Sequence, residues 1–339
     1  MNIAVIFGGI STERNVSIAG GKAVIEALRT KGHNVIAVDP ALGKNYKDSE
    51  NVALNASVFN TLDELKQMDT RNYIESINSE AFDNIDVAFI VLHGKNGEDG
   101  LIQSLLELRG IHYTGSGVRA CAVAIDKAMS KNLFAAAGLL TPPWLHVHIN
   151  EIDDDNNISK EIKRELGNQV VIKPNYQGSS IGISIIKDGN IDKIYQGLIL
   201  ASQYSNSIIV EKFIEGREIT VGILGAEALP VIEIIPQENY YDYEHKYTKG
   251  HTKYECPANI PEDIAEFAQS MSIICNNIIG ASGFSRVDFR LTDEGEPYLL
   301  EINTIPGFTA TSLVPMAANQ IGIAFPELCE KIIDLALKK

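Results

Sequence analysis

The chain has 339 residues, a formal net charge of −15, and ordinary hydrophobic (45%) and charged (22%) fractions, which predict a globular protein of two or three domains. So acidic a chain is poorly suited to nucleic acid or to an anionic membrane surface. The four cysteines have no metal-ligand spacing and predict reduced thiols. The N-terminus has no signal-peptide pattern, and no apolar run approaches the ~18 residues of a membrane span. We therefore expect a cytoplasmic protein that binds neither nucleic acid nor membrane.

The first part of the chain alternates strands and helices. Residues 2–9, NIAVIFGG, form an apolar strand that ends in glycines, and residues 11–33 carry apolar side chains at helical spacing. Residues 34–40 give the next strand, and residues 86–100 give another that ends in a glycine-rich turn. This order predicts a doubly wound parallel sheet at the N-terminus.

The later part of the chain has a different pattern. Two polar stretches, 41–80 and 150–161, are expected to be loops. From about residue 170, short apolar runs predict antiparallel strands. Residues 237–257 hold five tyrosines and three lysines between strands and are too long for a turn. They are either a mobile lid over phosphates or a surface loop with packed tyrosines.

Acids interrupt two apolar strands near the C-terminus. Asp288 lies in GFSRVDFRL, and Glu301 and Asn303 lie two residues apart in YLLEIN, so the latter pair shares one face of a strand. A buried carboxylate is costly unless it is paired. These oxygen ligands suit Mg²⁺ held together with substrate phosphates. The alternative is two separate acids, each hydrogen-bonded locally or paired with Arg286 or Arg290.

Residues 177–182, QGSSIG, join two short strands through small residues whose backbone N–H groups can bind an anion. Lys173 lies in the preceding apolar run, where it could pair with that anion. The alternative is an ordinary hairpin turn with a lysine that extends to solvent. No Walker A pattern is present.

Two further segments have possible ligand-binding roles. Residues 208–221, IIVEKFIEGREITV, could offer backbone hydrogen bonds and an aromatic ring to a base, with Glu218 on a ribose. From the residues alone an edge-strand hairpin is favoured. Residues 7–17, FGGISTERNVS, bring Glu13 to the crevice above a parallel sheet, where it either binds a substrate ammonium or stabilises the first helical turn. The dinucleotide pattern GxGxxG is not met.

The order of the motifs is more specific than any one of them. GGISTERNVS, LHGKNGEDG, YTGSGV, AIDKAMSK, IKPNYQGSSIG, VEKFIEGRE, YDYEHKYTKG, FSRVDFRL and YLLEINTIPGFTATSLVP follow one another along nearly the whole chain. In this the chain resembles the D-alanine–D-alanine ligases of the ATP-grasp family. The resemblance implies an α/β protein, α+β in its C-terminal part, in which an ATP-grasp fold follows the doubly wound parallel-sheet domain.

The resemblance also implies a division into domains. The N-terminal α/β domain, with the first D-alanine site, would span residues 1–120. The central ATP-grasp subdomain would span 121–207. The C-terminal ATP-grasp subdomain, with a lid loop at 236–256 and the metal site, would span 208–339. The family further implies a homodimer.

The activity implied is the ATP-dependent ligation of two D-alanines for peptidoglycan, through an acyl phosphate and a tetrahedral intermediate. The implied metal is two Mg²⁺ ions, with Mn²⁺ as an alternative. The implied metal ligands are Asp288, Glu301 and Asn303. The implied ATP-binding residues are Lys127, Lys173, Ser179, Glu211, Lys212, Phe213, Ile214, Glu218 and Lys246.

The amino-acid substrates would be held by a third set of residues. The implied substrate-binding residues are Glu13, His93, Arg286, Gly307 and Ser312. The implied catalytic residues are Glu13, Ser179, Tyr247, Arg286 and Gly307. In this set Arg286 and the Gly307 N–H would form an oxyanion hole, and Tyr247 would tie the lid to Glu13 and Ser179.

Tyr247 also bears on the acceptor. The related D-alanine–D-lactate ligases usually have histidine in this part of the lid, so Tyr247 favours an amine acceptor. Other readings are a D-alanine–D-lactate or D-alanine–D-serine ligase, or a silent nucleotide-binding regulator, which would have no need of so complete a set of residues. A dinucleotide-dependent oxidoreductase fits poorly without GxGxxG.

Overall fold

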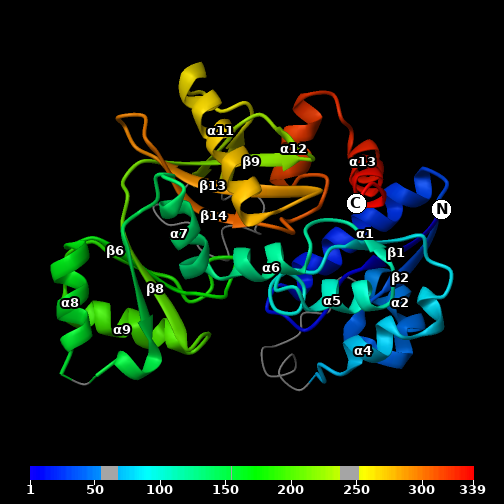
Figure 1. The fold of residues 1–339 in the computed structure, drawn as a ribbon, viewed down its shortest axis with the longest axis horizontal. Coiled ribbons are helices and arrows are strands. Elements are labelled where there is room, and N and C mark those ends of the chain that lie inside the picture. Colours follow the sequence, from blue (N-terminus) through cyan, green and yellow to red (C-terminus); the bar gives the residue numbers. More distant parts are fainter. Residues whose placement is uncertain (55–67, 154, 237–251) are drawn as a thin grey trace.

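The computed structural model describes residues 1–54, 68–153, 155–236 and 252–339, which form three lobes (Figure 1). Lys246 and Tyr247, and with them most of the expected lid, lie outside the described residues. In the described ranges, no helix is long and apolar enough to cross a membrane.

The N-terminal lobe contains a four-stranded sheet in the order β2-β1-β3-β4, and every pair is parallel. β1 and β3 are almost wholly buried, as expected for runs of Ile, Val, Ala and Phe in a sheet covered on both faces. The parallel sheet predicted for this part is therefore confirmed. Its elements are β1 (Asn2–Ile6), α1 (Arg14–Thr30), β2 (Asn34–Val38), η1 (Pro40–Asp48), α2 (Ser49–Leu54), α4 (Asn72–Ile77), η2 (Glu80–Phe82), β3 (Val87–Ile90), α5 (Leu101–Leu108) and β4 (His112–Tyr113).

Part of the stretch 41–80, expected to be loop, is helical. η1, α2 and α4 lie within or against it, and α4 buries Tyr73 and Ile77 in the core of this lobe. The other stretch expected to be a loop, 150–161, is also helical in part, since η3 (Ile149–Glu151) ends and α8 (Asn157–Leu166) begins within it. Both expectations were wrong there because the helical segments inside these stretches are too short to show a clear periodicity.

The central lobe is an antiparallel sheet in the order β5-β8-β6-β7 with its own hydrophobic core. β8 pairs with both β5 and β6, so a division after residue 207 would separate β8 from its sheet. The elements are β5 (Trp144–His148), η3 (Ile149–Glu151), α8 (Asn157–Leu166), β6 (Val170–Pro174), β7 (Ser184–Ile186), α9 (Ile191–Ser202) and β8 (Ser207–Lys212).

The C-terminal lobe is a second antiparallel sheet in the order β12-β11-β9-β13-β14, with β10 paired to β9. α6, α7 and α11 pack on it and share its core. The antiparallel strands expected after residue 170 are thus confirmed in both lobes. The elements are α6 (Val118–Ile125), α7 (Lys127–Ala136), β9 (Arg217–Leu224), β10 (Glu227–Ala228), β11 (Ile232–Pro236), β12 (Thr252–Glu255), α11 (Glu262–Ile279), β13 (Phe284–Leu291) and β14 (Pro297–Asn303).

The last two helices, α12 (Leu313–Gln320) and α13 (Phe325–Leu337), bring the chain back to its beginning. Figure 1 shows α13 beside α1 and the N-terminal sheet. Leu328, Ile332 and Ile333 of α13 belong to the same buried core as β1 and β3. The Lys31 ammonium of the α1 end lies 2.7 Å from Glu327 Oε1. The N-terminal and C-terminal lobes are therefore joined by a common core.

Candidate active site

The three lobes meet at a small cavity to which each contributes. It is lined by Glu98 of the N-terminal lobe, Gly178 of the loop after β6, and Asn303 at the end of β14. Lys127, at the start of α7, and Glu301 lie beside them. The sheet order of the N-terminal lobe reverses between β1 and β3. The loops that follow these two strands open on the crevice where such folds bind ligands.

Four polar residues share one face of β13 and β14. Asp288 pairs in register with Glu301, and Arg286 pairs with Asn303. Residues directly opposite in an antiparallel pair, and residues two apart on a strand, lie on the same face. This register places Arg286, Asp288, Glu301 and Asn303 together, as the sequence predicted for the acids.

Asp288 accepts hydrogen bonds from three neighbouring side chains. Arg286 donates to it from Nε at 2.8 Å and from Nη2 at 2.7 Å. Asn303 Nδ2 donates to Asp288 Oδ2 at 3.0 Å, and Thr220 Oγ1 donates to Oδ1 at 2.6 Å. The pairing with Arg286 that was the alternative to a metal site is thus present, together with the shared face that a metal site requires.

The residues fit a divalent cation by their chemistry. Asp288 and Glu301 lie opposite each other and offer carboxylates, and Asn303 adds an amide oxygen. Positive charge is already present beside both acids. Arg286 forms an ion pair with Asp288, and the Lys127 ammonium lies 3.3 Å from Glu301 Oε2. Over the described ranges, no three His, Cys, Asp or Glu side chains form a metal-binding group. A bound Mg²⁺ would therefore take further oxygens from Asn303, water and nucleotide phosphates.

Lys127 is fixed by the way α7 begins. The Asp126 side chain caps the helix by accepting from the Met129 N–H at 3.0 Å. The Lys127 ammonium donates to the Gln177 carbonyl at 2.7 Å, in the loop after β6. Lys127 therefore connects the glycine-rich loop of the central lobe to Glu301 of the C-terminal lobe.

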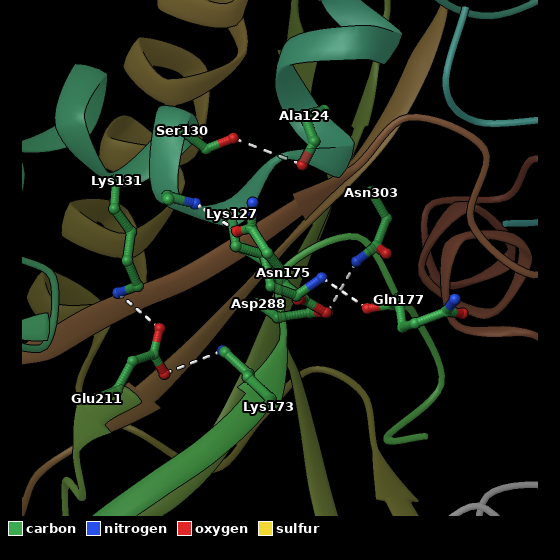
Figure 2. Close-up of polar contacts among 12 residues, drawn as sticks. Ala124, Lys127, Ser130, Lys131, Lys173, Asn175, Gln177, Glu211, Asp288 and Asn303 are labelled. Carbon is green, nitrogen blue, oxygen red and sulfur yellow. Dashed lines mark hydrogen bonds and ion pairs between the residues drawn. The ribbon is translucent and has the colours of Figure 1, made fainter. Parts of the chain in front are cut away.

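A buried group of three charged side chains lies next to Lys127. The Glu211 carboxylate on β8 contacts the ammonium of Lys173 on β6 and that of Lys131 on α7, each at 2.9 Å (Figure 2). Burial lowers the pKa of Lys131 to about 8. Burial also disfavours the charges of Lys173 and Glu211, but their mutual attraction outweighs it, so the pKa of Lys173 is raised and that of Glu211 is lowered.

Lys131 was not among the residues expected in the site. It stands four positions after Lys127, so both lysines lie on one side of α7. Two lysines at this spacing in one helix are a weak sequence signal for it, because the sequence does not show that both are buried.

The segment expected to frame adenine connects the two antiparallel sheets. The N–H groups of Lys212 and Phe213 donate to the Pro143 carbonyl at 2.8 Å and to the Gln169 carbonyl at 2.9 Å. The edge-strand hairpin favoured from the residues alone was wrong. β8 lies between β5 and β6 in one sheet, and β9 lies between β11 and β13 in the other. These long-range pairings cannot be read from local alternation.

Two cations from other parts of the chain lie near the Phe213 ring of this segment. The Lys187 ammonium lies 4.6 Å from its centroid, and the Arg290 guanidinium lies at 5.8 Å. Arg290 Nη1 is also 3.7 Å from Glu218 Oε2. Lys212 is exposed and Ile214 is partly buried.

Glu13 lies across the cavity, at the start of α1. Ser179 Oγ donates to Glu13 Oε1, so the N-terminal lobe touches the glycine-rich loop of the central lobe. Ser179 and Ser180 have φ angles of +52° and +59°, a conformation that only strong surrounding contacts maintain in residues other than glycine. A Cβ added at Gly94 or at Gly178 would lie 3.0 Å from Glu13 Oε2. The backbone thus encloses this carboxylate closely.

A buried ion pair supports the loop that carries Glu13. Arg14 Nη2 contacts Asp39 Oδ2 at 2.5 Å, and Arg14 Nη1 donates to the Gly9 carbonyl at 2.6 Å. Asp39 Oδ1 accepts from the Gly9 N–H at 3.0 Å. Ser17 Oγ accepts from the Gly8 N–H at 2.8 Å and donates to the Val91 carbonyl at 2.6 Å. These contacts fix the turn between β1 and α1.

His93 and Glu98 form the wall next to Glu13. His93 Nδ1 lies 2.9 Å from the Ile305 carbonyl, and burial lowers its pKa. Glu98 Oε2 accepts from the Gly94 N–H at 2.7 Å. Burial, together with the charge of Glu13, raises the pKa of Glu98 to about 8. Glu98 was not expected in the site, although an acid in the glycine-rich turn after a buried strand was a signal for it.

Gly307 and Ser312 adjoin each other in the loop after β14. A Cβ on Gly307 would lie 3.6 Å from Ser312 Oγ. Ser312 occupies the N-cap position of α12 without a side-chain capping hydrogen bond, and its hydroxyl accepts from the Thr309 N–H at 2.9 Å. Backbone N–H groups at a helix start favour a carboxylate.

Two antiparallel sheets facing each other across lysines and acids form the ATP-grasp fold, and this chain has it. Its residues 2–116 match the family described as D-ala D-ala ligase N-terminus, and residues 133–334 match D-ala D-ala ligase C-terminus. The chain belongs to the D-alanine–D-alanine ligase family, as its motifs predicted.

Individual proteins agree with this assignment. The D-alanine–D-alanine ligase of Geobacter sulfurreducens is 41% identical over 332 residues, which cover 98% of this chain and 92% of that protein. The one from Anaeromyxobacter sp. is 40% identical over 99% of this chain and 97% of its own length. The crystal structure of the Bacillus anthracis D-alanine–D-alanine ligase superposes with a TM-score of 0.78 at 31% identity, covering 100% of this chain and 98% of that one. Its complex with ATP gives a TM-score of 0.75 at 31% identity, covering 100% and 97%.

Proposed function

We propose that this chain joins two molecules of D-alanine into D-alanyl-D-alanine, with conversion of ATP to ADP and phosphate, for peptidoglycan biosynthesis. The observation that carries the proposal is the place where the three lobes meet. There, lysines and acids suited to a metal–nucleotide complex lie beside the enclosed carboxylate of Glu13, at the switch point of the parallel sheet. Both matched segments of the chain are named for D-alanine–D-alanine ligases.

In the first step, the carboxylate of one D-alanine attacks the γ-phosphorus of ATP, and ADP leaves. Glu13 holds the ammonium of that D-alanine, with Ser179 fixing the carboxylate of Glu13. Lys127 and Lys173 neutralise the phosphate oxygens. Mg²⁺, held by Asp288, Glu301 and Asn303, would supply further neutralisation of the charge on the transferred phosphoryl group.

In the second step, the amine of the other D-alanine attacks the carbonyl carbon of the acyl phosphate, a C–N bond forms, and phosphate leaves as the amine loses its proton. Arg286 and the Gly307 N–H stabilise the oxyanion, with Arg286 oriented by its two bonds to Asp288. Ser312 at the start of α12 binds the carboxylate of this second D-alanine, and His93 lies near its amine.

The nucleotide base and ribose have their own contacts in the proposal. The backbone from Glu211 to Ile214, with Lys212 and Phe213 between them, frames adenine, and Glu218 binds the ribose hydroxyls. For the lid we propose that Lys246 reaches the γ-phosphate and that Tyr247 completes the hydrogen-bonded set with Glu13 and Ser179.

At the level of the whole protein, we propose three domains, with the second division after Lys212 because β8 belongs to the central sheet. We further propose a cytoplasmic homodimer. Sedimentation equilibrium of the purified protein tests the dimer, and a monomer at micromolar concentration would contradict it.

The function is tested by measuring phosphate release from ATP with Mg²⁺, together with product analysis, while D-alanine, L-alanine, D-serine and D-lactate are offered singly and in pairs. We expect release with D-alanine alone and the dipeptide as product. Phosphate release that requires D-serine or D-lactate would identify that compound, in place of D-alanine, as the acceptor. The absence of release with every substrate would overturn the proposal.

A further inference from the structure

The three buried charges at Lys131, Glu211 and Lys173 do not balance. The residues are 0%, 2% and 7% exposed, and two ammonium groups share one carboxylate (Figure 2). Buried charges are stable only when they are paired. The group therefore has one positive charge more than its own carboxylate can neutralise, and this excess favours an anion nearby.

The two lysines differ in what else holds them. Lys131 Nζ also donates to Thr141 Oγ1 at 2.5 Å, and Thr141 in turn donates to the Leu299 carbonyl of β14 at 2.8 Å. The Lys131 ammonium also lies 5.5 Å from the centroid of the Trp144 ring. Lys131 on α7 is thus held by Glu211 of β8 and Trp144 of β5, and through Thr141 it is connected to β14.

Lys173 has fewer described contacts than Lys131. Its described contact is the one with Glu211, and the charges of Glu301 and Asp288 on the opposite sheet also reach it. It is the lysine that can turn toward a phosphate. If it does so, Glu211 loses one of its two cationic partners while it remains buried.

We infer that Lys131 is a positioning residue of the nucleotide site: it keeps Glu211 ion-paired at all times, so that Lys173 is available to the phosphates. Without Lys131, Lys173 is the one cation that remains in ion-pair contact with Glu211 among the described residues, and Glu211 retains it. A buried unpaired carboxylate would otherwise result, at high cost. Burial is the main cause of the lowered pKa of Lys131, and a phosphate bound nearby would oppose that effect. The inference rests on the proposed function, since it requires that the site binds ATP.

The test compares ligands with and without phosphates, by calorimetry on the full-length protein in the absence of D-alanine. The probes are the Mg²⁺ complex of a non-hydrolysable ATP analogue and adenosine. Lys131→Met should weaken the analogue about tenfold or more and change adenosine affinity less than threefold. Lys131→Arg should restore most of the analogue affinity. Lys339→Met is the control for loss of a lysine charge elsewhere. Lys339 is an exposed residue whose ammonium contacts the Tyr113 ring and the Gly115 carbonyl, and its substitution should leave both affinities unchanged.

A second background keeps the test independent of folding losses. In Glu211→Gln there is no buried carboxylate to hold, so adding Lys131→Met should weaken the analogue less than twofold further. Equal losses of analogue and adenosine in Lys131→Met would overturn the inference, since they indicate a general structural role. An undiminished effect in the Glu211→Gln background would also overturn it. Failure of the proposed function would be seen separately, as wild-type protein that binds the analogue but forms no dipeptide.

Discussion

The two sides of the site are built by different means. Around Glu13 the backbone forms most of the surroundings. Glycines approach the carboxylate closely, the turns contain residues with positive φ angles, and one buried ion pair supports the loop that carries Glu13. Around Glu211 and Glu301 long side chains from α7, β6 and β14 reach inward and neutralise one another. The first side is shaped to hold a small ligand in one pose. The second side is a set of ion pairs whose lysines can exchange a protein carboxylate for a phosphate of a bound polyanion.

The largest effect should come from the charged side. Glu301→Gln removes a carboxylate from the face shared with Asp288 and leaves Lys127 without its acidic partner. We expect kcat to fall by about 10³-fold or more, because charge stabilisation in the phosphoryl-transfer step is lost. Phosphate release and far-ultraviolet circular dichroism measure activity and fold together. A folded variant with near-native turnover would contradict the metal role.

The next effect should come from the support beneath Glu13. Asp39→Ala removes a buried carboxylate that pairs with Arg14, and we expect a loss of about 3–5 kcal/mol in the free energy of unfolding. Glu50→Ala is the control, because it breaks an exposed pair with Arg29 that contributes about 0–1 kcal/mol. Urea unfolding of both variants gives the comparison. Similar losses in the two would show that the buried pair does not fix this loop.

A glycine substitution isolates the close approach of the backbone. Gly94→Ala and Gly138→Ala both place alanine at positive φ, +65° and +74°, but only the Gly94 Cβ meets Glu13, at 3.0 Å, while nothing lies within 4 Å of the other. We expect Gly94→Ala to raise the KM for D-alanine by roughly tenfold, because a displaced carboxylate binds the ammonium less well. Gly138→Ala should leave the KM unchanged. Equal KM values in both variants would mean that Glu13 tolerates the displacement.

The smallest effect should be a pH dependence on the Glu13 side. Glu98, with its pKa raised to about 8, stabilises the folded protein fully below pH 4.5, and that contribution is lost as the pH rises toward 8. The stability of wild type relative to Glu98→Gln should therefore fall by about 1 kcal/mol or more between pH 5 and pH 8. Parallel stability curves for the two proteins would contradict the raised pKa. Glu50→Gln gives the opposite sign as a control, because Arg29 lowers the pKa of Glu50 and its contribution is lost as the pH falls.

The sequence predicted the parts of this molecule whose signal is local. The strand of residues 2–6, the helix that follows, and the shared face of Glu301 and Asn303 follow from periodicity over a few residues. The family and its fold followed from the order of motifs. Pairings over long distances did not follow: the segment 208–221 looks like one hairpin, yet its halves lie inside two sheets.

The same limit applies to the site. Asp288, Glu301 and Asn303 were expected because each is an exception in an apolar strand. Lys131 and Glu98 were missed because their role depends on burial, and burial depends on residues far along the chain: Glu211 for Lys131, and Glu13 for Glu98. A lysine in a helix or an acid in a turn is ordinary until its partners are known.

The return of α13 to the first sheet has a consequence for how the protein is made. Leu328, Ile332 and Ile333 are part of the core that β1 and β3 need, but they are synthesised long after those strands leave the ribosome. The lobe that is translated first is therefore completed last, whereas the central lobe has a core made entirely of its own residues. The central lobe can fold while translation continues, and the apolar surface left exposed in the meantime belongs to the N-terminal strands.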